Sequence, residues 1–332
     1  MTGNRLFINA YYPIKRYMPR RVQLMVRRVF ATAKRRLNRH VWPIDPDSAT
    51  PPEQWNGWPG GKRFAFVLTH DVDTQRGHDR CLDLMKLEQA SGFVSSFNLV
   101  AGEYVVLPEL RRCLRDNGFE VGVHGLYHNA EMYESRVKFN RQAVRINRYL
   151  REWESVGFRS PCMYHNLEWL RGLDISYDAS TFDTDPFEPQ PDGMGTIFPF
   201  IVEGEEEGRG YVELPYTLPQ DFTLFVLFRE KNIDTWKRKL DWVVKKGGMV
   251  LLNTHPDYMN FRDERHTYEE YPARLYRDLL EHVKSSYGDS FWNPLPREVA
   301  AWYRERLHRE DGSADREMIG MSGDHGIAGA CA

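Results

Sequence analysis

Residues 66–74 read FVLTHDVDT, an apolar run that ends on His70, Asp71 and Asp73. A short apolar run of this kind is typical of a buried strand. An imidazole and two carboxylates at the end of such a strand are costly to bury unless they are paired or bind a metal ion. The end of this strand is therefore the first candidate for a functional site.

The same kind of run recurs along the chain and alternates with segments of helical character. From Phe64 the β-prone runs are FAFVLTHDV, SSFNLV, FEVGVHG, GFRSP, DISYDAST, YVELPYT and MVLLNTH, with helices expected at 81–90, 108–117 and 136–153. Strands separated by helices pair in parallel, because the chain must cross over between them. The pattern predicts an α/β fold, either a (β/α) barrel, distorted or regular, or an open doubly wound sheet.

The composition is that of a globular protein with many aromatic side chains. Of the 332 residues, 41% are hydrophobic and 13% aromatic, and the mean hydropathy is −0.60. No run approaches the roughly 18 apolar residues of a membrane-spanning helix. The N-terminus carries charges and prolines where a signal peptide would be apolar, and the four cysteines form no CxxC pair. These features predict a cytoplasmic location.

Basic side chains are concentrated in residues 1–40. This segment holds 11 of the 45 Lys and Arg residues and none of the 47 Asp and Glu residues, so the rest of the chain is strongly acidic. Within the segment, Val22, Val26, Val29 and Phe30 recur at helical spacing, which predicts a basic amphipathic helix.

This basic helix has two interpretations. It either packs on the main domain or attaches the protein to an anionic membrane surface, peripherally on the inner face. Nucleic acid is not expected as a partner, since no recognition motif follows and the acidic remainder of the chain would repel phosphate.

Local composition divides the chain into four parts. Residues 1–40 form the basic helical segment, and 41–63, which contain Pro, Asp and Gly, are expected to form a linker. Residues 64–310 form the catalytic domain. Residues 311–332, rich in Gly, Asp and Ser, are expected to be a disordered tail.

Other strand ends carry the same chemistry as the first. His124 and His128 follow the third run, Arg159 lies in the fourth, and His255 follows the last. A single histidine at a strand end is more often structural than a ligand. The carboxyl ends of parallel strands, however, meet in one cleft. Several titratable groups gathered there indicate a catalytic or metal site.

Asp73, His124 and His128 form the candidate metal site. The spacing of the two histidines places them one turn apart if the segment coils. Two imidazoles and one carboxylate suit Zn²⁺ and leave a coordination position for water, and iron, cobalt or nickel are also compatible. Asp71 is then a candidate base and His255 a candidate acid.

The motifs THDVD, HGLYH, RSP, YDAS and LLNTHP, in this order over residues 64–260, resemble the polysaccharide deacetylase family of metal-dependent carbohydrate esterases, which remove N-acetyl groups from sugars. The resemblance implies a distorted (β/α) barrel with Zn²⁺ or another divalent ion on Asp73, His124 and His128. It also implies attack by a metal-bound water, with Asp71 as the base and His255 as the acid.

The resemblance assigns supporting roles as well. Arg159 would keep the carboxylate of the base ionised, and the backbone N–H of Cys162 would help to stabilise the oxyanion. Asp178 in YDAS or Asp183 in TFDTDPF would orient His255.

Some residues depart from the usual family pattern. Val72 separates the two aspartates, and His70 stands where Phe is usual. Cys162 and Met163 replace the usual aromatic residue and glycine. The DxD arrangement is similar to a branch that includes amidases acting on non-sugar C–N bonds.

Three functions follow as hypotheses. The leading one is removal of N-acetyl groups from a sugar of a glycan or lipid-linked saccharide. The second is hydrolysis of a small cyclic imide or ureide. The third is carbohydrate binding without catalysis, which the presence of base, ligands and acid disfavours.

Overall fold

Strand β1 (Phe64–Val72) lies at the centre of a nine-stranded sheet in the computed structural model, which describes residues 18–204, 210–262 and 267–307. Every residue of β1 is buried. One edge pairs with β8 (Met249–Thr254), and the other pairs with β2 (Ser96–Leu99) and β11 (Phe291–Trp292), all in parallel. The buried strand predicted from FVLTHDVDT is confirmed.

The sheet continues from β2 on one side and curls back toward β8. Its order after β2 is β3 (Glu120–Val123), β4 (Gly157–Phe158), β5 (Tyr177–Asp178), β7 (Gly210–Glu213) and β6 (Phe200–Glu203). Only the β6–β7 pair is antiparallel among these strands. The predicted parallel α/β fold is confirmed.

The barrel is incomplete in the part of the chain that the structure describes. The segment after β7 reaches β8 through an isolated parallel bridge between Leu218 and Leu252, and a second isolated bridge joins Phe182 to Tyr216. Isolated bridges in place of a continuous ladder make this a distorted barrel. The distortion leaves one side of the strand ends open for the segments that follow β5 and β7.

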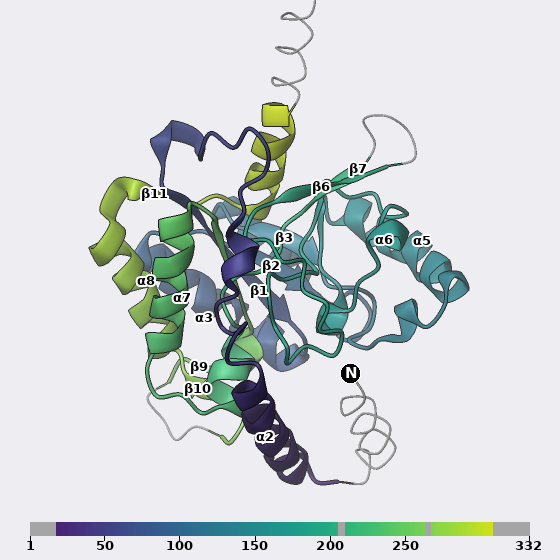
Figure 1. Ribbon diagram of the computed structural model, residues 1–332. Coiled ribbons are helices and arrows are strands. Elements are labelled where there is room, and N and C mark those ends of the chain that lie inside the picture. Colours follow the sequence, from purple (N-terminus) through teal and green to yellow (C-terminus); the bar gives the residue numbers. More distant parts are fainter. Residues whose placement is uncertain (1–17, 205–209, 263–266, 308–332) are drawn as a thin grey trace, which may run out of the picture.

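Helices cover the outside of the sheet (Figure 1). The helices α3, α7 and α8 lie on one side of the molecule in this view, and α5 and α6 lie on the other. Their bounds are α3 (Gln75–Ser91), α4 (Pro108–Asp116), α5 (Arg136–Glu152), α6 (Leu167–Leu170), α7 (Asp234–Lys246) and α8 (Arg274–Tyr287), and residues 296–307 are also helical. The three crossover helices predicted at 81–90, 108–117 and 136–153 correspond to α3, α4 and α5.

Helix α2 (Arg20–Leu37) packs on the main domain. Leu24 and Ala31 bury one face of the helix. Arg28 donates from Nε to the carbonyl oxygen of Val226 (3.0 Å) and from Nη2 to that of Tyr268 (2.9 Å). The described part of the basic segment therefore packs on the main domain, while Met25, Val29 and Leu37 on its outer face remain exposed.

The predicted linker 41–63 is irregular but tightly packed. Trp42 and Trp58 are buried, and the Trp58 indole donates to the carbonyl oxygen of Gly247 at 2.9 Å. The carbonyl oxygen of Ser48 accepts from Ile197 N at 3.0 Å. This stretch contributes to the core, whereas the tail predicted at 311–332 lies outside the described residues. Among the helices of the described ranges, none has the length and apolar character to cross a membrane.

Candidate active site

Asp71 and Asp73 project toward the same side of the sheet because side chains alternate along a strand. His70 projects to the opposite side, where its Nδ1 lies 2.7 Å from Thr254 Oγ1 and its Nε2 lies 2.8 Å from Glu88 Oε1. His70 is thus part of a buried structural network beneath the helices. The residue between the two aspartates is what allows both carboxylates to reach the same site.

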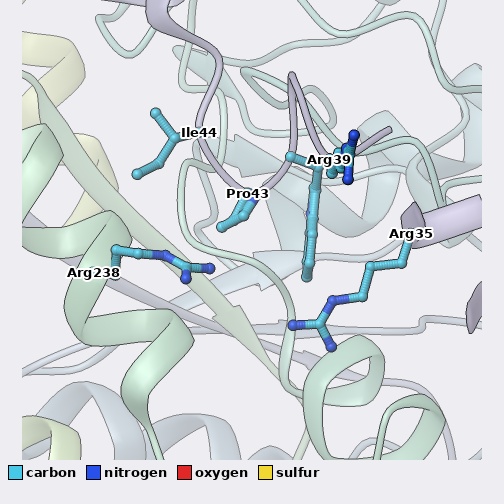
Figure 2. Close-up of a pocket in the computed structure, with 6 residues that line it drawn as sticks. Arg35, Arg39, Pro43, Ile44 and Arg238 are labelled. Atoms are coloured by element: carbon cyan, nitrogen blue, oxygen red, sulfur yellow. The ribbon is translucent and has the colours of Figure 1, made fainter. Parts of the chain in front are cut away.

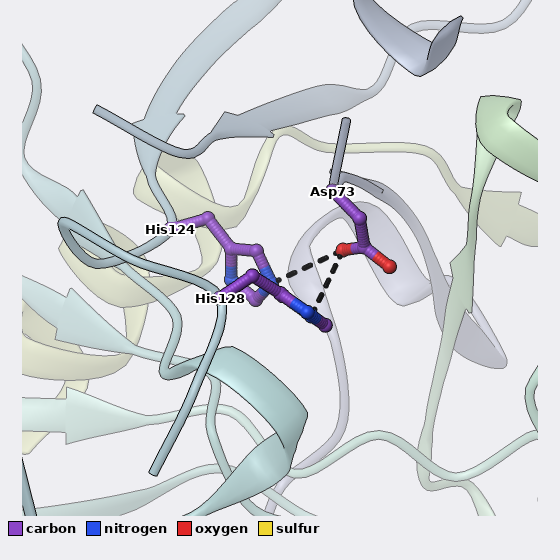
Figure 3. A group of neighbouring side chains, drawn as sticks. All are labelled: Asp73, His124 and His128. Carbon is purple, nitrogen blue, oxygen red and sulfur yellow. Dashed lines mark ion pairs between the residues drawn. The ribbon is translucent and has the colours of Figure 1, made fainter. Parts of the chain in front are cut away.

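Asp73, His124 and His128 converge at the carboxyl ends of β1 and β3 (Figure 3). Asp73 Oδ1 lies 3.5 Å from His124 Nε2 and 3.2 Å from His128 Nε2. One potential ligand atom from each residue lies within 4.8 Å of the others. The three residues predicted as metal ligands are therefore brought together.

The two histidines meet through a loop and not through a helical turn. Residues 124–128 follow β3 without helical structure, and Gly125 has a left-handed φ of 68°. A Cβ at Gly125 would come within 2.7 Å of Pro161 Cγ. The reversal of the chain at Gly125 brings His128 back beside His124. The two histidines therefore lie close together although the segment between them is not helical.

The unused donor atoms of this group fit a divalent cation. His124 Nδ1 lies 3.0 Å from the carbonyl oxygen of Arg159, which can only accept, so the lone pair of the neutral ring is on Nε2. His124 Nε2 and Asp73 Oδ1 are buried without a hydrogen-bond partner among the described residues. Burial lowers the pKa of His128, but Asp73 raises it to about 12 in sum. The negative charge of Asp73, which stabilises a proton on His128, would also stabilise a metal cation.

Asp71 is held by amide and cationic groups from three strand ends. Its two carboxylate oxygens accept from Asn98 Nδ2 (3.0 Å) and Asn253 Nδ2 (2.7 Å), and Arg159 Nη1 lies 3.7 Å from Oδ1. Burial alone would raise the pKa of Asp71, but the positive charges of His124, in its protonated form, and of Arg159 outweigh it and hold the pKa below its ordinary value. Asp71 is thus a buried carboxylate that stays ionised.

The sequence prediction missed both asparagines. Asn98 is the register partner of Asp71 on β2, and it faces Gly122 on β3. A Cβ at Gly122 would come within 2.2 Å of Asn98 Oδ1, so glycine leaves the room that the amide needs. Asn253 pairs with Thr69 across β1 and β8. The signal was an asparagine within an apolar strand, in SSFNLV and in LLNTHP.

His255 is oriented by Asp221, which corrects the prediction of Asp178 or Asp183. His255 Nδ1 lies 2.7 Å from Asp221 Oδ1, and the backbone N–H of His255 donates to Asp221 Oδ2 at 2.9 Å. Tyr271 also donates its hydroxyl to Asp221 Oδ2 at 2.8 Å. Asp221 directly precedes a short π-helical segment, Phe222–Leu227, in a stretch that carries no recognised motif.

The two aspartates predicted for this role have other partners. Asp178 accepts from the hydroxyl and the backbone N–H of Ser180. Asp183 forms an ion pair with the buried Lys239 (Oδ2–Nζ 2.5 Å). Both are occupied in structural contacts near β5, whereas His255 lies at the end of β8.

The electrostatics of His255 suit a proton donor. Burial lowers the pKa of its imidazole, but Asp221 raises it, and the charges of Asp73 and Asp71 raise it further, to about 10. The protonated form of His255 is therefore favoured, and the negative charges of Asp71 and Asp73 are near enough to contribute to this.

The backbone at Cys162 is held in an unusual conformation. Cys162 and Met163 both have a φ of 54°, a left-handed region that non-glycine residues seldom adopt. Such strain often accompanies functional sites. The Cys162 thiol lies 3.9 Å from His128 Nε2, which places this turn beside the metal ligands. The predicted oxyanion role of its N–H remains a prediction.

Comparison with known proteins identifies the fold. No family model and no curated protein matches the sequence. Among solved structures, proteins provisionally named polysaccharide deacetylases match with a TM-score of 0.57: one from Mycobacterium smegmatis at 19% identity (78% of this chain, 96% of that chain) and one from Pseudomonas aeruginosa at 17% (80% and 99%). The chain has the polysaccharide deacetylase fold. The PuuE allantoinase matches equally well, with a TM-score of 0.57 at 16% identity over 78% of this chain and 96% of the other.

Replacement of either His124 or His128 by alanine is expected to abolish stoichiometric binding of a divalent metal, because each change removes one of three ligands. Elemental analysis of the purified proteins measures the bound metal. His282→Ala, on α8, is the matched control and should keep the metal. If both site variants retain a full equivalent, these residues are not the ligands.

Asp221→Asn is expected to lower the pKa of His255 from about 10 toward the ordinary imidazole value of about 6.5, because Asp221 is the main group that raises it. The sign follows from charge: loss of the carboxylate disfavours the imidazolium, so the proton leaves at lower pH. An NMR titration of the ring, assigned with a His255→Gln variant, measures the change. Asp174→Asn, at an exposed position, should leave the pKa unaltered, and an unaltered value in Asp221→Asn would contradict the orientation assigned here.

Proposed function

We propose that the protein is a metal-dependent hydrolase that removes N-acetyl groups from a sugar of a glycan or lipid-linked saccharide. One observation carries the proposal: an ionised carboxylate, Asp71, lies beside a three-ligand site and close to a protonated histidine, His255. A base and an acid with pKa values moved in opposite senses are what amide hydrolysis requires.

Zn²⁺ is the cofactor that the ligand set favours, held by Asp73, His124 and His128. When bound, it would polarise the acyl oxygen and lower the pKa of a water molecule. Iron, cobalt or nickel would fit the same set of ligands.

The side chains of the chain then divide the proton transfers between them. Asp71 takes a proton from the attacking water, and Asn98 and Asn253 keep its carboxylate oriented for this step. His255 gives a proton to the nitrogen of the departing amine, so that acetate and a free amino sugar are the products. Arg159 keeps Asp71 ionised, and the N–H of Cys162 supports the negative oxygen of the tetrahedral intermediate.

A second candidate is the hydrolysis of a small cyclic imide or ureide. The separation of the two aspartates by one residue and the structural likeness to an allantoinase favour it. Against it, aromatic rings beside the acid offer a surface for sugar faces: Tyr258 lies 5.4 Å from the His255 ring and Phe222 lies 4.9 Å from Tyr258, centroid to centroid.

The protein is expected to release acetate from at least one member of a panel of N-acetylated glycans, and Asp71→Asn is expected to reduce kcat by about 100-fold or more while keeping the metal. Loss of the base removes proton transfer without removing a ligand. Acetate release and metal content are measured on the same samples, with Asp83→Asn on α3 as a control. Hydrolysis of a cyclic ureide alone would favour the second candidate, and full activity in Asp71→Asn would remove Asp71 as the base.

We further propose that α2 holds the protein peripherally on an anionic membrane from the cytoplasmic side. Packing on the domain leaves Met25, Val29 and Leu37 exposed at 58%, 70% and 76% on the outer face of the helix. Arg21 and Arg36 are exposed as well. Apolar and basic side chains on one exposed face suit an anionic bilayer surface.

Val29→Glu is expected to weaken binding to anionic vesicles, because it places a negative charge on the membrane-facing side of α2. Co-sedimentation with vesicles of anionic and neutral lipid measures binding, which should also fall as salt rises. Val144→Glu, at an equally exposed valine on α5, is the matched control. If the unaltered protein ignores anionic vesicles at low salt, α2 is a purely structural helix.

A further inference from the structure

A cavity of about 360 Å³ lies where the chain leaves α2 and passes α7. It shares no residue with the candidate active site. Figure 2 shows Arg35 of α2 and Arg238 of α7 extending toward one another, with Pro43 near the space between them. The lining residues are Arg35, Arg39, Trp42, Pro43, Ile44 and Arg238.

The cavity carries an excess of positive charge. Arg35 forms an ion pair with Glu230 (Nη2–Oε1 2.8 Å). Arg39 and Arg238 have no acidic partner within the described ranges. Lys239 is close by, since its ammonium group binds the carbonyl oxygen of Pro43. Three guanidinium groups on one small cavity repel each other, so an anion bound there would relieve the repulsion.

Two of the cationic side chains are held in place by their neighbours. The Arg35 guanidinium lies over the rings of Trp42 (5.2 Å) and Phe228 (4.6 Å). The buried Lys239 is neutralised by Asp183 at 2.5 Å, so this carboxylate is not available to the arginines. The Arg35 guanidinium is therefore fixed by packing, which lowers the entropic cost of binding an anion.

The polar side-chain groups that line the cavity are hydrogen-bond donors. Arginine side chains donate and do not accept, and the tryptophan indole only donates. Trp42 is 3% exposed, and its indole N–H has no hydrogen-bond partner among the described residues. Phe187 and Phe228 pack edge-on against this ring and fix its position. A ligand rich in acceptors would satisfy the guanidinium donors, beside which the buried Trp42 ring forms a fixed wall.

We propose that this cavity is a binding site for a phosphomonoester. The phosphate group would bind between the guanidinium groups of Arg35, Arg39 and Arg238, since guanidinium groups match phosphate oxygens in pairs. Pro43 and Ile44 provide an apolar wall for the carbon part of the ligand.

The charge of the ligand distinguishes a phosphomonoester from a sulfate ester. A phosphomonoester is a dianion above its second pKa of about 6, whereas a sulfate monoester carries a single charge. A protonated phosphate oxygen would also find no acceptor among these donors. The site should therefore favour the phosphomonoester, and the affinity should rise with pH as the ligand loses its second proton.

Calorimetric titration of the full-length protein with glycerol 3-phosphate, methyl sulfate and acetate at constant ionic strength tests the proposal. Glycerol 3-phosphate should bind saturably at pH 8, and about tenfold more weakly in Arg39→Gln or Arg238→Gln, since each removes a charge-assisted hydrogen bond. Both arginines are exposed, so the variants should fold, and their melting temperatures confirm this.

Two control variants establish that the ligand binds in this cavity and not elsewhere on the protein. Arg112→Gln, an exposed arginine on α4, should bind glycerol 3-phosphate as the unaltered protein does, which excludes a general charge effect. His128→Ala should also bind it normally, which excludes phosphate bound at the metal site.

Absence of saturable binding would overturn the proposal. So would binding that survives in Arg39→Gln and Arg238→Gln but is lost in His128→Ala. Methyl sulfate or acetate binding as tightly as glycerol 3-phosphate would overturn the assignment of a dianion.

Discussion

The site is organised around Asp71, because its buried negative charge must be compensated by neighbouring groups. An ionised carboxylate inside a protein costs several kcal/mol, on the order of the whole stability of a domain, unless other groups replace its hydration. Asn98 on β2, Asn253 on β8 and Arg159 directly after β4 do so here. The position of each strand relative to β1 is therefore constrained by a functional group, and only a parallel arrangement brings all three to its carboxyl end.

Arg159 connects this charge to the candidate metal site. Its guanidinium lies near Asp71, while its backbone carbonyl accepts from His124 Nδ1 and so selects the tautomer that presents Nε2 to a metal. One residue thereby contributes both to the ionised state of Asp71 and to the orientation of the His124 ring. Gly125, next in the chain after His124, then allows the loop to bring in His128.

Residues at strand ends were predictable from the sequence, whereas residues defined by register were not. Asp71, Asp73 and His255 follow apolar runs, and parallel pairing alone brings such ends together. Asn98 reaches Asp71 because the two residues are register partners on β2 and β1. The register between two strands cannot be read from the sequence of either strand. Asp221 acts because the chain after β7 bends toward β8 by isolated bridges, a distortion with no sequence pattern of its own. The sequence therefore predicted which residues form the candidate metal site, but it misplaced the aspartate that orients His255.

The fold alone does not determine the substrate, because proteins named as polysaccharide deacetylases and an allantoinase share it. The segment around Asp221 contacts both His255 and α2. Arg27 of α2 lies over Phe222 (4.8 Å), Phe222 packs on Tyr258 (4.9 Å), and Tyr258 packs on the His255 ring (5.4 Å). A helix at the surface is thus joined to His255 by a continuous series of ring contacts. Because Arg28 of α2 also donates to the carbonyl oxygen of Val226, α2 supports the π-helical segment that begins directly after Asp221, the residue that binds His255.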